Sequence, residues 1–289
     1  MLTIQNEHIK ASINPKGAEL VSLFHIGNQT EYMWEGNPEF WGKYSPVLFP
    51  IVGSLKNNTY FYQNQPYQLS RHGFARDKTF VVEQHDEQGV TLLLTHDDTT
   101  LAVFPFAFEF RLRYELVKNT LQVSYLVNNP ADSTLWFSVG GHPAFRIPLT
   151  PDTQYQDYYL QFNQQEDFPR WPLSAEGLIL TVPNPFLTNT NRLDLTKELF
   201  YEDAIVFKNY QSDSVVLKSD KTTHQLQFDF PNFPFLGIWA AKNANFVCIE
   251  PWCGIADHVD HNQDITQKEG IIALNPAETF ERTWSVRIS

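Results

Sequence analysis

Two side chains in this sequence interrupt or end an apolar strand, and both can move protons near neutral pH. The first is His142 in the stretch Val139–Phe145, where two glycines precede the imidazole and a proline follows it. Glycine in a strand marks a bulge or a close approach of a ligand or backbone. Histidine is the side chain best suited to proton transfer at this pH. A core histidine that donates to a carbonyl is the alternative, and this motif alone favours neither interpretation.

A carboxylate occupies a comparable position later in the chain. The apolar run Phe246–Ile249 ends in Glu250, which is followed by Pro251 and Trp252. A carboxylate at the end of a buried strand is costly unless it is paired or its pKa is raised. A raised pKa is what a general base needs near neutral pH. The alternative is a buried ion pair with an arginine.

A turn in the first third of the chain gathers polar residues around a glycine. Arg71, His72 and Arg76 flank Gly73 and Phe74. Arginine donates from a fixed fork that suits hydroxyl or phosphate oxygens. This crowding favours ligand binding over a surface turn held by ion pairs.

Two further stretches are weaker candidates when taken alone. Asp203 follows Glu202 at the start of the apolar run Ala204–Phe207, which fits a solvated strand start somewhat better than a binding carboxylate. Pro46 and Pro50 bracket another apolar run, and this pattern indicates a rigid buried crossover loop instead of a central strand.

The elements that must position these residues are strands. Apolar and polar residues alternate with period two in many segments, and turn residues separate them. Examples of the apolar positions are Leu121, Val123, Tyr125 and Val127, and later Phe280, Trp284, Val286 and Ile288. No linker, repeat or charge block divides the chain. The sequence therefore predicts an all-β protein, a large antiparallel β-sandwich that forms one domain over residues 1–289.

Two regions carry other local signals. Asp194–Glu202 is the best helical segment, with Asp194 as its cap. The region Asp152–Asn191 is rich in Gln, Pro, Thr and Asn, and it predicts long surface loops with short strands.

Composition limits the classes of partner and compartment. The net charge of -12 over 289 residues argues against binding to nucleic acid or to an anionic membrane. The two cysteines, Cys248 and Cys253, are too few for a disulfide framework and form no metal-binding motif. The chain has no signal-peptide pattern and no apolar run that spans a membrane, so we expect a cytoplasmic protein. The sequence carries no signal for an oligomeric state.

The remaining histidines stand singly among polar residues and are predicted to be exposed: His8, His25, His85, His96, His224, His258 and His261. The run Asp257–His261 matches no metal-coordination motif. We therefore expect a solvated loop there and no metal site.

Five motifs in order resemble the aldose 1-epimerase, or galactose mutarotase-like, family. In chain order they are FPIVG at Phe49–Gly53, HGFAR at His72–Arg76, GGHPAF at Gly140–Phe145, DAIVF at Asp203–Phe207 and EPWCG at Glu250–Gly254. The likeness runs from Trp34 to the last strand, and it is strongest to the LacX-like branch of bacterial lactose and galactose operons. Each motif is weak alone, whereas five in order are specific.

The resemblance implies a β-supersandwich and an enzyme that interconverts the α and β anomers of an aldose. By this analogy His142 is the general acid at the ring oxygen, and Glu250 is the general base at the anomeric hydroxyl. His72 is a second contact near the ring oxygen, while Arg76 and Asp203 hold sugar hydroxyls. The resemblance implies no metal and no other cofactor. The expected partner is a small-molecule sugar.

A phosphorylated sugar is an open alternative. Hexose 6-phosphate mutarotases of this superfamily carry an arginine shortly before the proline that corresponds to Pro46, and here only Lys43 could serve. Ser54 stands where LacX-like relatives often have arginine. Arg71 and Arg76 remain as a pair that could hold a phosphate.

Two other function classes compete with the epimerase. A sugar-binding or regulatory protein would keep the pocket without turnover. A glycoside hydrolase would use two carboxylates, Asp203 and Glu250, and would leave His142 without a role. We predict that His142 and Glu250 converge on one pocket. Trp252, Phe74 or Trp41 is expected to form an apolar wall for the sugar.

Overall fold

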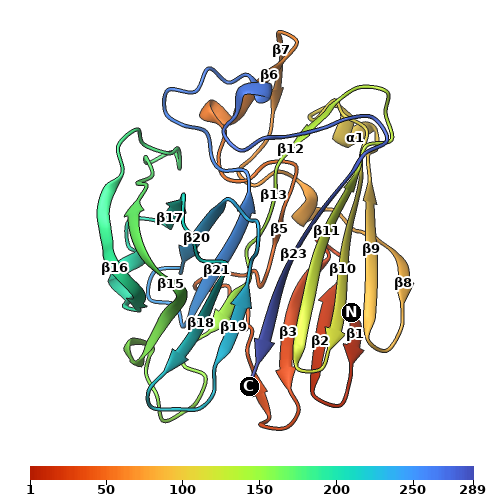
Figure 1. The fold of residues 1–289 in the computed structure, drawn as a ribbon. Coiled ribbons are helices and arrows are strands. Elements are labelled where there is room, and N and C mark those ends of the chain that lie inside the picture. Colours follow the sequence, from red (N-terminus) through yellow and green to blue (C-terminus); the bar gives the residue numbers. More distant parts are fainter.

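The computed structural model describes all residues 1–289, and its strands pair antiparallel throughout the sheets (Figure 1). The all-β prediction is confirmed. The largest sheet has nine strands in the order β16-β15-β18-β19-β23-β11-β10-β9-β8. In that order, the strands are Asn184–Asp194, Tyr158–Arg170, Ser214–Ser219, Leu226–Asp229, Thr279–Ile288, Thr120–Asn128, Glu109–Val117, Gly89–Thr95 and Val81–His85.

A second sheet of six strands carries most of the residues discussed above. Its order is β17-β20-β21-β13-β5, and β14 pairs with β21 beside this path. The strands are β17 (Ile205–Lys208), β20 (Phe235–Trp239), β21 (Phe246–Cys253), β13 (Val139–Gly141), β5 (Val47–Leu48) and β14 (Ala144–Arg146).

Smaller elements complete the fold. A four-stranded sheet contains β1 (Leu2–Gln5), β2 (Ile9–Asn14), β3 (Glu19–His25) and β4 (Thr30–Glu31). Two pairs are β12 (Leu135–Phe137) with β22 (Ile272–Leu274), and β6 (Thr59–Tyr62) with β7 (Gln65–Gln68). The helical segments are α1 (Asp98–Leu101), η1 (Lys56–Asn58), η2 (Ala75–Asp77), η3 (Tyr155–Asp157), η4 (Lys197–Phe200) and η5 (Ile265–Gln267).

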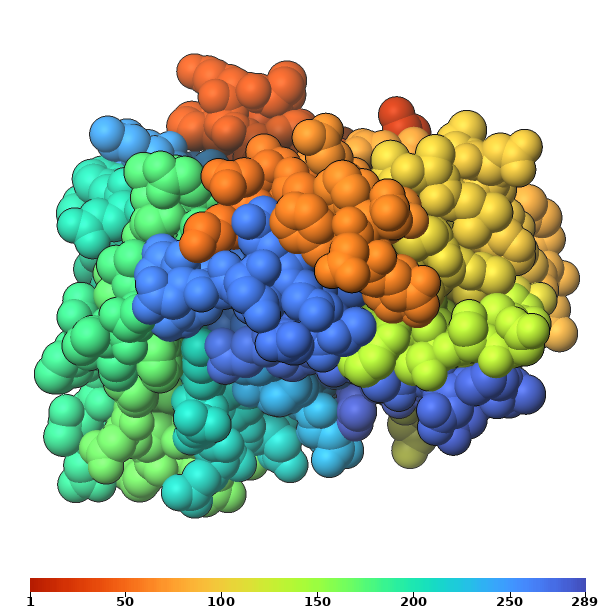
Figure 2. Space-filling view, turned by 90° about the horizontal axis from the view of Figure 1, so that it is seen from above, coloured from red at the N-terminus to blue at the C-terminus, as the bar shows by residue number.

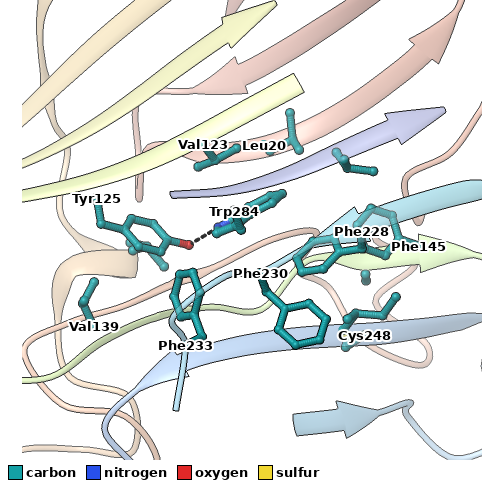
Figure 3. Close-up of a cluster of buried hydrophobic side chains, with 14 of the residues drawn as sticks. Leu20, Val123, Tyr125, Val139, Phe145, Phe228, Phe230, Phe233, Cys248 and Trp284 are labelled. Carbon is teal, nitrogen blue, oxygen red and sulfur yellow. Dashed lines mark hydrogen bonds between the residues drawn. The ribbon is translucent and has the colours of Figure 1, made fainter. Parts of the chain in front are cut away.

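Aromatic side chains join the two large sheets. Phe145 of β14 packs edge-on against Phe228 of β19 with ring centroids 5.7 Å apart, and Phe228 stacks on Trp284 of β23 (Figure 3). The Trp284 indole N–H donates to the Tyr125 hydroxyl over 2.7 Å, so the polar atoms of this core pair are satisfied. One cluster of 69 buried residues runs through the core, from Ile4 to Ile288.

Two local predictions were wrong. The region Asp152–Asn191 forms the long strands β15 and β16 at the edge of the nine-stranded sheet, instead of loops with short strands. Asp194 ends β16 and caps no helix; the helical turn there is the short η4, which Thr196 precedes. Because polar side chains cover both faces of β16, its sequence lacks the alternation that marks the other strands.

Segments far apart in sequence meet at one end of the molecule. Figure 2 shows residues near 50–75 in orange against residues near 255–265 in blue, with green segments beside them. Bridges between Ile179 and His258, and between Phe61 and Asp264, fix these neighbours. No helix is long and apolar enough to cross a membrane.

Candidate active site

A cavity of about 290 Å³ lies on the six-stranded sheet, near the lower end of the volumes of about 300–1,000 Å³ that are typical of small-molecule sites. Polar groups and aromatic faces share its wall. The lining includes Arg71, His72, Arg76, His142, Asp203 and Glu250, and the indoles of Trp41, Trp239 and Trp252. The residues come from β20, β21 and β13–β14, and from the turns around η2 and before β17.

His142 and Glu250 are in direct contact within this wall. His142 stands in the break between β13 and β14, and Glu250 is the fifth residue of β21. Nε2 of His142 is 3.3 Å from Oε2 of Glu250, and both side chains are buried, with 11% and 2% exposed. The predicted convergence is confirmed, and the contact is so close that a ring-shaped ligand would lie across the pair and not between its members.

The glycines before His142 make room for protein groups. A Cβ on Gly140 would stand 2.8 Å from Cδ1 of Trp252, and one on Gly141 would stand 2.6 Å from the Tyr125 hydroxyl. No side chain fits at either position without moving these groups. The glycines therefore let β13 lie close under the Trp252 indole, which brings His142 to the cavity.

Burial favours the uncharged form of each member of the pair. It lowers the pKa of His142 to about 3, and the positive charges of Arg71 and Arg76 act in the same direction. Burial also raises the pKa of Glu250 well above its usual range; Arg71 opposes this rise and Asp203 reinforces it. The empty site consequently favours one proton on the pair, held as the Glu250 carboxylic acid beside a neutral His142.

His72 is a fixed hydrogen-bond donor toward the cavity. Its Nδ1 accepts the backbone N–H of Gly53 over 3.1 Å, so its single proton sits on Nε2. Burial, together with the charges of His142, Arg71 and Arg76, holds its pKa well below the usual value. The residue has φ +70°, a left-handed backbone conformation that is unusual for a side chain other than glycine. A neutral imidazole thus presents an N–H at a defined point.

Asp203 and the two arginines supply the remaining polar groups. Oδ1 of Asp203 accepts the backbone N–H of Ala204 over 2.7 Å and is 3.6 Å from NH2 of Arg71. Asp203 also has a positive φ of +143°, and such backbone strain is concentrated at functional sites. Arg76 donates from NH2 to the Arg71 carbonyl, while its buried Nε has no hydrogen-bond partner.

Two of the proposed binding residues do not reach this cavity. Phe74 packs into the aromatic core, with ring centroids 6.3 Å from Phe49 and 6.2 Å from Phe104, so its prediction as a sugar wall is wrong. Lys43 lies 3.8 Å from Asp77 on the surface. Neither residue lines the cavity. Phe74 belongs to the HGFAR motif and Lys43 lies shortly before Pro46, but the chain directs both side chains away from the cavity.

Three parts of the wall were missed from the sequence. Trp239 ends β20 and meets His142 edge-on at 5.5 Å, and it also contacts Trp41, which stacks on the imidazole at 5.1 Å. The segment around Gly177, with Leu173 and Ile179, and the pair Ile255–Ala256 also line the cavity. Trp239, a tryptophan at the end of an apolar strand, is the one of these residues that the sequence could have indicated as a binding residue. The others belong to no motif.

The neighbouring run Asp257–His261 is not the solvated loop that the sequence predicts. Asp257 is buried and makes a 2.7 Å ion pair with Lys268. His261 is 3.4 Å from the same carboxylate, with 11% of its side chain exposed. Only one set of three side chains that can bind a metal has its ligand atoms within 4.8 Å of one another, and it consists of His142, Cys248 and Glu250.

Comparison with known proteins identifies the class that this fold and site belong to. The family model described as aldose 1-epimerase matches residues 1–285, and the chain belongs to this family. It is 32% identical to the chromosomal protein LacX of Lactococcus lactis subsp. lactis over 296 residues, covering 99% of each chain.

Two solved structures share the whole fold. A galactose mutarotase related enzyme from Lactobacillus acidophilus is 37% identical and has a TM-score of 0.94, with 99% of this chain and 96% of that chain covered. A galactose mutarotase-like protein from Lactobacillus casei ATCC 334 is 30% identical and also has a TM-score of 0.94, with 100% of each chain covered. These matches confirm the galactose mutarotase-like β-sandwich.

Proposed function

We propose that this protein is an aldose 1-epimerase that interconverts the α and β anomers of an aldose by general acid–base catalysis. The observation that carries the proposal is the 3.3 Å contact between His142 and Glu250 in the wall of the cavity. Ring opening removes a proton from the anomeric hydroxyl and delivers one to the ring oxygen. These two oxygens are bonded to the same carbon, so the acid and the base that serve them must lie side by side.

The proton inventory of the pair suits this cycle. When a closed sugar binds, a shift of the shared proton from Glu250 to His142 gives a carboxylate base and an imidazolium acid without changing the total charge. Glu250 then takes the anomeric proton while His142 protonates the ring oxygen. The open-chain sugar faces the carboxylic acid and the neutral imidazole that burial favours. Rotation about the bond between C1 and C2 and reversal of both transfers give the other anomer.

The neighbouring groups fit the supporting roles. His72 donates from Nε2 near the pair, since its ring lies edge-on to His142 with centroids 5.8 Å apart. Arg76 and Asp203 hold sugar hydroxyls by charge-assisted hydrogen bonds. The indoles of Trp41 and Trp252 offer apolar faces to the C–H groups of the ring. No step in this mechanism needs a metal or an organic cofactor. We place the reaction in the cytoplasm, where the two free cysteines would stay reduced.

The rate should depend on pH as a bell-shaped curve, because activity needs one proton on the pair. The acid limb is the addition of a second proton, and the lowered pKa of His142, about 3, moves this limb to low pH. The alkaline limb is the loss of the last proton, and the raised pKa of Glu250 moves it upward from the usual carboxyl range. These limbs belong to the pair and not to single residues.

The test is catalysed anomer exchange, followed by NMR on α-glucose and α-galactose across pH. Exchange above the buffer rate is expected, with the broad bell described above. If no aldose or aldose phosphate exchanges above background but a sugar binds, the protein is a sugar-binding member of the family and the enzymatic proposal is wrong.

An aldose phosphate is the second candidate substrate, and one observation favours it. Arg71 and Arg76 both line the cavity, and the Asp203 carboxylate lies 3.6 Å from Arg71 without contacting Arg76. An anionic substituent would complete the charge balance. Comparing glucose with glucose 6-phosphate in the same exchange experiment decides between the two substrates.

A further inference from the structure

Beside the acid–base pair lies a third side chain that the proposed reaction does not use. Cys248 is buried on β21, two residues before Glu250. One ligand atom from each of His142, Cys248 and Glu250 lies within 4.8 Å of the other two. The three side chains offer a nitrogen, a thiol sulfur and a carboxyl oxygen, which is a donor set that Zn²⁺ takes in proteins.

We propose that His142, Cys248 and Glu250 form a binding site for a thiophilic divalent cation of the Zn²⁺ type, and that occupation of this site inhibits the protein. Binding of the cation does not depend on the proposed function. The inhibition does rest on it. A cation bound to Nε2 of His142 and to the Glu250 carboxylate would block the atoms that donate and accept the protons of the sugar.

The distances are close to those of a coordinated ion. Zn–N and Zn–O bonds of about 2.0–2.2 Å at tetrahedral angles hold the two ligand atoms about 3.3–3.5 Å apart. Nε2 of His142 and Oε2 of Glu250 are already separated by 3.3 Å. A Zn–S bond of about 2.3 Å places a thiolate about 3.6 Å from a nitrogen or oxygen ligand. The Cys248 sulfur lies within 4.8 Å of one ligand atom of each partner, so it must approach by about 1.2 Å at most.

The imidazole can turn toward a metal without losing a hydrogen bond. Nδ1 of His142 is buried and has no partner, so no second bond fixes the ring to the protein. The ring packs against Trp41 and Trp239, whose indoles also contact each other with centroids 5.5 Å apart. Three protein ligands leave a fourth tetrahedral position open, and His142 and Glu250 both border the cavity from which a water or a sugar hydroxyl would enter.

Charge balance selects a dication that binds sulfur. Bound as a thiolate and a carboxylate, Cys248 and Glu250 cancel the charge of one dication, and His142 adds a neutral imidazole nitrogen. The occupied site therefore carries no net charge. Mg²⁺ and Ca²⁺ prefer all-oxygen sites and should not compete.

Direct binding is tested on the chelator-treated protein with Co²⁺ and Zn²⁺. Co²⁺ should give the intense near-ultraviolet absorption of a cobalt–thiolate bond, and Zn²⁺ should abolish it. Binding of Zn²⁺ should release protons, because a metal-bound thiol loses its proton, so affinity should rise with pH. Absence of a thiolate band in the unmodified protein, or binding without proton release, would overturn the proposal.

The two buried cysteines provide matched variants. Cys248→Ala and Cys248→Ser remove the sulfur ligand, whereas Cys253→Ala removes a buried thiol five residues further along β21. Loss of a direct ligand should weaken Zn²⁺ binding by at least about 100-fold, because even outer-shell partners are worth about 10–100-fold. A loss in Cys253→Ala with none in either Cys248 variant would assign the metal elsewhere.

Inhibition is measured as the ratio of anomer exchange with and without buffered Zn²⁺ for each variant. The ratio should fall for the unmodified protein and for Cys253→Ala, return toward one in the Cys248 variants, and be relieved by excess sugar. Bound Zn²⁺ with full exchange would overturn the inhibition. If the unmodified protein shows no exchange without Zn²⁺, the proposed function fails, while the cobalt spectrum still decides the metal site.

Discussion

Two buried pairs of an acidic and a basic side chain, His142–Glu250 and Asp257–Lys268, differ in their geometry and in the bonds that their carboxylates accept. Asp257 and Lys268 are wholly buried, with Oδ1 and Nζ 2.7 Å apart. His142 and Glu250 are buried to a similar degree but lie 3.3 Å apart and border the cavity. Burial alone thus does not decide what a pair does.

The hydrogen bonds to the carboxylate account for the difference. Asp257 accepts the backbone N–H of Lys56 over 2.9 Å in addition to the Lys268 ammonium, and His261 lies beside it. Burial opposes its ionisation, yet these groups together lower its pKa to about 2. No backbone N–H bonds the Glu250 carboxyl, so burial prevails there and its pKa rises.

The two pairs divide their work accordingly. The backbone N–H of Asp257 donates to the Ser54 carbonyl, and its carbonyl accepts the Ile179 N–H. The residue that carries the ion pair therefore joins two segments that line the cavity. The His142–Glu250 pair is left with a proton that no hydrogen-bond network fixes. A pair whose carboxylate accepts several hydrogen bonds is suited to stabilising the fold. A pair whose carboxyl accepts few is suited to proton transfer.

The largest expected effect is on catalysis by the His142–Glu250 pair. Glu250→Gln and His142→Asn should each lower kcat for anomer exchange by at least about 100-fold, the low end for a positioned proton-transfer group. The double variant should be little worse than the poorer single one, because the two groups act as a unit. NMR exchange spectroscopy measures the rates, and circular dichroism checks folding.

The matched control for this loss is another buried carboxylate. Glu166 accepts bonds from Gln211 and Ser212 and is remote from the cavity lining. Glu166→Gln should keep its exchange rate when folded. Near-normal exchange in folded Glu250→Gln would refute the proton-transfer role.

The next largest effect is on stability and concerns the Asp257–Lys268 pair. Asp257→Asn leaves Lys268 buried without its counter-charge and should cost about 3–5 kcal/mol of unfolding free energy. Because the folded-state pKa of Asp257 is depressed, its contribution is present above the usual value of 3.8 and is lost as pH falls through about 2. Urea unfolding measures both quantities.

An exposed pair provides the control for Asp257. Asp194 is 2.7 Å from Arg192, with 69% and 45% of the two side chains exposed, so Asp194→Asn should cost less than about 1 kcal/mol. Equal losses in the two variants would contradict the distinction between the pairs. Replacing Asp257 and Lys268 together by apolar residues should recover part of the loss.

The sequence reveals one of these pairs and hides the other for a physical reason. His142 and Glu250 break the pattern of apolar strands, so each was found as an anomaly, and alternation predicted the strands that carry the core. Asp257 and Lys268 lie in polar stretches that look solvated, and only the fold shows that both are buried. The opposite error occurred at Phe74, where a motif neighbour was taken as a binding residue.

Long-range closeness was the second kind of information that the sequence lacked. Cys248 was interpreted as a core thiol, and its approach to His142 depends on the pairing of Ala144 with Cys248 between β14 and β21. The strand β16 is not evident from the sequence, because irregularities interrupt its register against β15 and most of its residues are polar and at least partly exposed. Neither feature leaves a periodic signal.

The smallest expected effect is on the unfolding free energy of the Glu250→Gln variant. Because the folded-state pKa of Glu250 is raised, its contribution is fully present below the unfolded value near 4.5 and is lost as pH rises through the folded value. Glu250→Gln removes this loss. At pH 8 the variant should therefore be more stable than the unmodified protein. The gain should vanish below the usual carboxyl pKa. Urea unfolding at pH 4 and pH 8 measures it, with the exposed Glu87→Gln as a control that should show no such trend. A carboxyl whose ionisation is opposed by burial should thus lower the stability of the folded protein at neutral and alkaline pH. A Glu250→Gln variant that is less stable at pH 8 would instead show that Glu250 is a stabilising ion like Asp257.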